Sequence, residues 1–192
     1  MCRFSDASKR KLGNTVLYIA QNAKYPYKTE VLKLLFLMEE RMVQQYHVPF
    51  LAIPFSVWRL GPVSVDVFEE LSDGPVLLDD YICLQTNANG VKVVAKADFN
   101  DEEFSDAELG MMKQVMDKYG KMNSEQLVNE THKEGSLWQI TAKEHGLLED
   151  FENRRANSSN VVLDMGRQLC PDAREFYQES LDIRQTANLM QL

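Results

Sequence analysis

The chain has 192 residues, of which 44% are hydrophobic and 26% charged, and its net charge is −8. These proportions are typical of a globular protein with one hydrophobic core. No run approaches the ~18 apolar residues that a membrane helix requires, the N-terminus lacks a signal-peptide pattern, and the three cysteines include no C-x-x-C pair, so we expect a cytoplasmic protein.

The charge is unevenly distributed, because residues 51–150 carry 19 acidic side chains against eight basic ones. Such an acidic segment repels phosphate backbones, which disfavours nucleic acid as a partner of the whole protein. The segment is either a solubilising surface or an acidic face for a basic partner.

Apolar residues at helical spacing predict a first helix over residues 8–21. Pro26 then breaks the chain, and Thr29 is expected to cap a second helix over residues 30–46. Apolar residues cover most of this second helix, so we expect it at the centre of the core, buried on several sides. The narrow polar stripe that remains consists of Lys33, Glu40 and Gln44.

Two glycine turns punctuate the next part of the chain. Gly61-Pro62 follows a short irregular or strand passage ending at Trp58, and it predicts a turn with proline near the start of a helix. Asn89-Gly90 separates two β-rich runs, residues 81–85 and 91–95. Asn-Gly in this context is typical of a β-hairpin, because both residues accept positive φ.

The segment 105–132 carries two consecutive capping boxes, Ser105 with Glu108 and Asn123 with Gln126. Gly120 between them is expected to end the first helix in the left-handed conformation. The two helices could form a DNA-binding helix-turn-helix unit, but the second offers one lysine and two glutamates, whereas base and phosphate contacts favour Arg and Lys. We interpret the unit as a packed helix pair and keep a nucleic-acid-associated regulator as an alternative.

The pattern weakens after residue 145, where residues 157–160 indicate a loop and a last helix is expected after Pro171. Together the elements predict an α+β fold that is predominantly α-helical, a compact helical domain with one small β-hairpin.

Catalytic and metal-binding motifs do not occur in the sequence: it has no phosphate loop, G-x-G-x-x-G, G-x-S-x-G or H-E-x-x-H. A zinc site could use His132, His145 and either Glu134 or Glu144, but no i, i+4 pair puts two ligands on one helix face. We therefore expect no enzyme, no cofactor and no bound metal.

Three blocks of sequence resemble the Panacea domain of the SocA-type antitoxins. Residues 33–37 resemble the KLLYLAD helix of that family, residues 58–63 contain its Gly-Pro step, and residues 104–138 resemble its third block. Met38-Glu39 replaces the usual Ala-Asp, and Leu137 stands where proline often precedes the tryptophan.

The resemblance covers roughly residues 9–140. It implies a Panacea-like antitoxin domain over residues 1–150 and a C-terminal extension, residues 151–192, whose final helix packs on the same domain. It also implies a protein that binds and neutralises a cognate toxin by direct contact, usually encoded next to it in bacteria or prophages. Some relatives act as adaptors that present the toxin to a AAA+ protease, and a prophage interaction protein without a toxin partner is a further alternative.

The resemblance and the local pattern single out five partner-binding candidates: Trp58, Gly61, Pro62, His132 and Trp138. Tryptophan is favoured at binding hot spots, so the two tryptophans and the histidine could line a shared groove. The competing interpretation is structural, with Gly61-Pro62 at a helix start, His132 as a satisfied helix-end residue and Trp138 as an apolar core residue.

Overall fold

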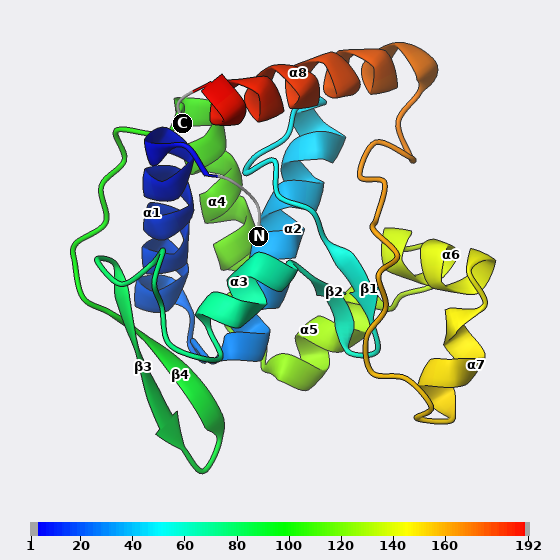
Figure 1. Ribbon diagram of the computed structural model, residues 1–192, viewed down its shortest axis with the longest axis horizontal. Coiled ribbons are helices and arrows are strands. Elements are labelled where there is room, and N and C mark those ends of the chain that lie inside the picture. The colour runs from blue at the N-terminus through cyan, green and yellow to red at the C-terminus, as the bar shows by residue number, and fades with distance from the viewer. Residues whose placement is uncertain (1–3, 191–192) are drawn as a thin grey trace.

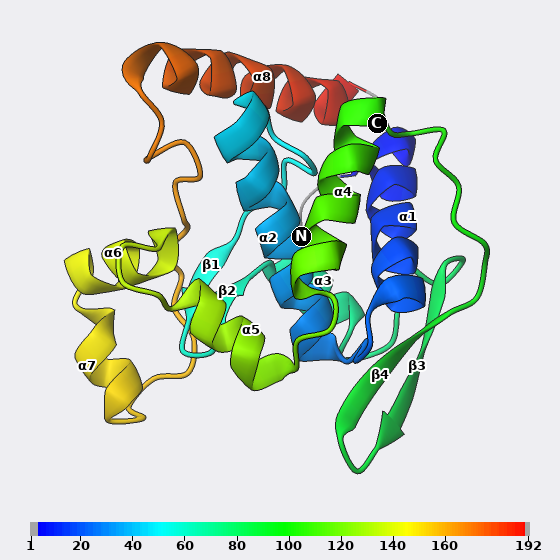
Figure 2. The ribbon, with the colours of Figure 1, turned by 180° about the vertical axis from the view of Figure 1, so that it is seen from behind.

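Helix α2 (Lys28–Tyr46) is the centre of the computed structural model, which describes residues 4–190. Val31, Leu35 and Met38 on this helix are fully buried, and Figures 1 and 2 show the long helices α1 and α4 alongside it. The prediction of a central second helix is confirmed. In chain order, α2 contacts α1 (Asp6–Asn22), β2 (Gly61–Val63), α3 (Val65–Glu70), β4 (Gly90–Ala95), α4 (Asp106–Tyr119) and α5 (Ser124–Thr131).

Both predicted capping boxes form. The Ser105 side chain accepts a hydrogen bond from the backbone N–H of Glu108, whose carboxylate accepts one from the Ser105 backbone. Asn123 and Gln126 exchange the same pair of bonds at the start of α5. Each box satisfies N–H groups that a helix start leaves without intrahelical partners.

Two predicted helix ends are wrong. Gly120 adopts φ −64°, a right-handed conformation, and glycine is needed there because a Cβ would lie 2.7 Å from the Met116 carbonyl oxygen. Helix α2 begins at Lys28 with Tyr27, not Thr29, at its N-cap. The cause is a contact distant in sequence, since Pro26 accepts a hydrogen bond from a β4 backbone N–H at 2.8 Å and so fixes the chain just before the helix.

The predicted hairpin is present, but its turn consists of Ala88 and Asn89, and only Gly90 of the predicted Asn89-Gly90 pair has a positive φ. A second strand pair accompanies this hairpin. β3 (Ile82–Asn87) pairs antiparallel with β4, and β1 (Ser56–Trp58) pairs antiparallel with β2. Pro62 therefore lies in a strand, and α3 starts only at Val65, so the helix predicted from Gly61-Pro62 begins later than expected. The predicted fold class, α+β and predominantly helical, is confirmed.

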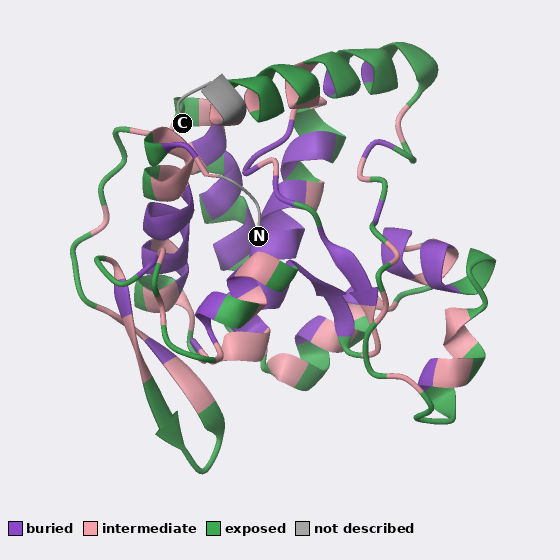
Figure 3. Ribbon diagram, in the orientation of Figure 1, coloured by how far each residue is buried: buried purple, intermediate pink, exposed green. Residues whose placement is uncertain are grey.

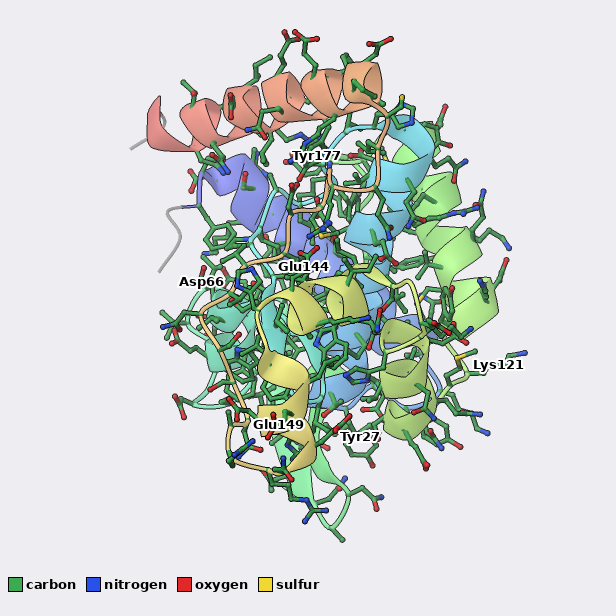
Figure 4. All side chains as sticks on the ribbon, turned by 90° about the vertical axis from the view of Figure 1, so that its right-hand side faces the viewer. Tyr27, Asp66, Lys121, Glu144, Glu149 and Tyr177 are labelled. Atoms are coloured by element: carbon green, nitrogen blue, oxygen red, sulfur yellow. The ribbon has the colours of Figure 1, made fainter. Side chains whose placement is uncertain are left out.

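The last third of the chain wraps around this core. After α6 (Leu137–Glu144) and α7 (Leu147–Glu152), the segment 153–170 runs beside β1, where Val57 N–H donates to Val161 O at 2.8 Å. Helix α8 (Pro171–Met190) then lies across one end of α2, with most of its residues exposed (Figure 3). Tyr177 points from α8 toward the body of the protein and is buried (Figure 4).

The division into residues 1–150 and 151–192 stays a prediction. Among the helices within residues 4–190, none combines the length and apolarity needed to cross a bilayer.

Candidate functional site

Lys33 is buried inside the protein, although its place in the polar stripe of α2 predicted a solvated side chain. Only 1% of it is exposed, because the β1–β2 hairpin covers this face of the helix, and its Nζ donates a hydrogen bond to Pro62 O at 2.7 Å. Burial lowers the pKa of Lys33 to about 7. Burying an ammonium group is costly, so a buried lysine points to a functional role.

Gly61 brings the hairpin against α5 and α2. Its φ is +96°, a conformation that side-chain-bearing residues rarely adopt. A Cβ there would lie 2.6 Å from Thr131 Oγ1 and 3.0 Å from Lys33 Cε. Glycine is thus required both by the backbone conformation and by the close approach of two buried side chains.

Trp138 joins α6 to the same hairpin. Its indole Nε1 donates to Trp58 O at 2.9 Å, and its ring meets the His132 ring edge-on with centroids 3.6 Å apart. Burial lowers the pKa of His132 to about 4, with a smaller contribution from the charge of Lys33. His132 is therefore neutral at pH 7, and its buried Nε2 has no hydrogen-bond partner among the described residues.

The five candidate residues lie close together around the β1–β2 hairpin, but they differ in exposure. Gly61, Pro62 and Trp138 are buried, while Trp58 and His132 are partly exposed. Trp58 lines a pocket on the surface. The packing agrees with the structural interpretation for Trp138, which is a core residue, whereas Gly61 and Pro62 lie in strand β2 and not at a helix start. The partner-binding role of the set stays a prediction.

The pocket beside Trp58, which we call the hairpin pocket, has a volume of about 280 Å³. It opens between the start of α2, the turn from β1 to β2, helix α3 and one residue of the segment 153–170. Sequence reasoning missed most of its lining, because these residues are far apart in the chain and form no motif. The lining comprises Lys28, Thr29, Leu32, Lys33, Trp58, Arg59, Leu60, Val63, Phe68 and Asn157.

The hairpin pocket is apolar with a basic rim and floor. Three of its lining residues, Lys28, Lys33 and Arg59, are basic and none is acidic. Lys28 Nζ lies 4.3 Å from the Phe68 ring centroid, and Arg59 Nε donates to Asn157 Oδ1 at 2.7 Å. None of the three cations forms an ion pair with a residue that the structure describes.

A second pocket, of about 410 Å³, lies under α8 and includes the buried Glu39. The Glu39 carboxylate accepts the backbone N–H groups of Phe50 and Leu51 at 3.0 and 2.7 Å. Burial raises the pKa of Glu39. Since both oxygens hold the loop after α2, we assign this residue a structural role.

The residues considered for zinc do not form a site. His145 follows the last turn of α6, and within residues 4–190 no group of three His, Cys, Asp or Glu side chains is placed to hold a metal ion.

A family model described as "Antitoxin SocA-like, Panacea domain" matches residues 31–139, which run from α2 into α6. No curated protein and no solved structure matches the chain.

Proposed function

Because this chain belongs to the family of SocA-like antitoxins with a Panacea domain, we propose that it neutralises a cognate protein toxin by binding it directly, without catalysis. The family match carries this proposal, since it covers most of α2, the β1–β2 hairpin and α3. These elements build most of the hairpin pocket.

The binding face of this proposal is the turn from β1 to β2 together with the hairpin pocket. Leu60 is 49% exposed at this turn, and Trp58 beside it packs edge-on against Phe68 with ring centroids 4.8 Å apart. An exposed leucine next to a partly exposed tryptophan is a suitable centre for a protein interface. In this arrangement Trp58 contacts the toxin, whereas Gly61 and Trp138 hold the hairpin in position behind it.

The proposal is tested by co-expressing the chain with the product of the neighbouring open reading frame, scoring growth and co-purification. Leu60→Asp should abolish both rescue and co-purification, because it places a charge in the interface without disturbing the core. Ile183→Asp on α8 is the matched control, since Ile183 is 69% exposed on a different face. If the neighbouring product neither inhibits growth nor co-purifies with the wild type, the antitoxin role is wrong.

The same cultures distinguish two modes of neutralisation. Occlusion leaves the level of the toxin unchanged, whereas delivery to a AAA+ protease lowers it in cells that contain the protease. Immunoblots that compare the level of the tagged toxin in cells with and without that protease distinguish the two modes.

A further inference from the structure

The hairpin pocket combines apolar walls with three cations that have no ion-pair partner among the described residues. We propose that it binds the free C-terminal end of a protein partner, with the last apolar side chain in the pocket and the terminal carboxylate on Lys33, Lys28 and Arg59. This inference rests on the proposed function, since it specifies which part of the toxin the chain holds.

The basic side chains of the pocket favour an anion, and an anion beside Lys33, whose pKa burial lowers to about 7, would hold that side chain in its charged form. An ammonium group has three N–H donors, and Lys33 Nζ uses one of them on Pro62 O. Lys28 donates to Ser72 Oγ at 3.2 Å and Arg59 to the Asn157 side chain, both neutral acceptors. A carboxylate could therefore bind all three cations without breaking an existing ion pair, and bonds between charged partners are the strong ones.

The size of the pocket favours a chain end over an internal acidic residue. A volume of about 280 Å³ equals roughly nine water-sized groups at ~30 Å³ each, enough for a leucine side chain and a carboxylate. In an extended segment, neighbouring side chains point to opposite faces, and residues two apart are separated by ~7 Å. Only the last residue of a chain carries an apolar side chain and a carboxylate on the same Cα.

A nucleic-acid phosphate is the weaker candidate for the anion. The chain has a net charge of −8 and the pocket walls are mostly apolar, whereas phosphate backbones are held by extended basic surfaces. Inorganic phosphate therefore serves as a comparison ligand in the test.

The test uses the ¹⁵N-labelled full chain, titrated with N-acetyl-L-leucine, with N-acetyl-L-leucinamide and with inorganic phosphate. The acid should shift the amide signals of Arg59, Leu60 and Asn157. The affinity for the amide should be lower by about tenfold or more, because the amide lacks the charge-assisted bonds. Equal binding of acid and amide, shifts confined to another region, tighter binding of phosphate, or no shift at all would each overturn the inference.

Variants assign the effect to the cations. Lys33→Met and Arg59→Gln should each weaken acetyl-leucine binding roughly tenfold. Lys121→Gln should leave it unchanged, because Lys121 is exposed in the turn between α4 and α5, away from the pocket (Figure 4). Because Arg59 is partly exposed, Arg59→Gln should leave the fold intact. This variant therefore tests the inference even if Lys33→Met does not fold.

A last comparison separates this inference from the antitoxin proposal. The neighbouring gene product is co-expressed intact and without its last three residues. Loss of co-purification on truncation supports the pocket as the site for the chain end. If the truncated product still co-purifies, the inference is wrong and the antitoxin role stands; if neither form binds, the antitoxin role is wrong.

Discussion

Replacing Lys33 with methionine should stabilise the protein at pH 6 and destabilise it slightly at pH 10. Lys33 is 1% exposed and its pKa is lowered from 10.5 to about 7 by burial. This difference corresponds to about 5 kcal/mol of penalty on the charged form in the folded state. Methionine removes that penalty but leaves Pro62 O without its donor, at a cost of about 1–3 kcal/mol. We therefore expect a net gain of about 2–4 kcal/mol at pH 6.

The pH dependence follows from the protons bound by each state. Below pH 7 both states carry a protonated Lys33, so the penalty is present in full. Between pH 7 and pH 10.5 the unfolded chain binds a proton that the folded protein does not, so the wild-type free energy of unfolding rises with pH through this window. Near pH 10 the penalty is almost gone, and the methionine variant loses only the hydrogen bond to Pro62.

Urea unfolding of the two proteins, followed by circular dichroism at pH 6, 8 and 10, measures this difference. Ionisable groups that both proteins share contribute equally to the two free energies of unfolding, so their contributions cancel in the difference. Lys121→Met at an exposed position is the control and should show no pH-dependent difference. A Lys33→Met variant that is destabilised equally at all three pH values would refute the reasoning, because Lys33 would then contribute by packing and not by a buried charge.

Three further predictions concern the residues around the pockets. Gly61→Ala should lower the free energy of unfolding by about 2–4 kcal/mol in urea titrations, since it combines strain at φ +96° with a contact of 2.6 Å to Thr131 Oγ1; an unchanged midpoint would contradict this. Trp138→Phe should cost about 1 kcal/mol through the lost bond to Trp58 O and keep toxin co-purification; a stable variant that no longer binds would place Trp138 in the interface. Glu39→Leu should cost about 2–4 kcal/mol because two buried backbone N–H groups lose their acceptor, with Glu39→Gln intermediate; thermal melting of the three proteins checks the order.

Local patterns in the sequence predicted the elements that depend on interactions between residues close together in the chain. The boxes at Ser105 and Asn123 depend on residues three apart, and the β3–β4 hairpin depends on a two-residue turn before Gly90. The central helix was predictable because its apolar residues surround most of its circumference.

Contacts between distant residues explain what the sequence did not predict. Lys33 was placed in a polar stripe because helical periodicity has no information about the hairpin that covers it, 29 residues further along. The same pairing of Gly61-Pro62 with residues 57–58 turned an expected helix start into a strand. The tryptophans led to the five partner-binding candidates. The basic residues of the hairpin pocket and Asn157 could not be found in this way, because they do not recur at a regular spacing in the sequence.

Asn157 forms one wall of the hairpin pocket, yet it lies outside residues 31–139, the part of the chain that the family model matches. The pocket is thus lined by residues of the matched region and by residues on both sides of it, Lys28 and Thr29 before it and Asn157 after it. Exchanging the segment 153–160 for that of another family member would reshape the pocket without changing α2, as long as the new segment keeps a small apolar residue at Ala156, which packs against the core. If the toxin occupies the hairpin pocket as we propose, this exchange should change which toxin the chain binds.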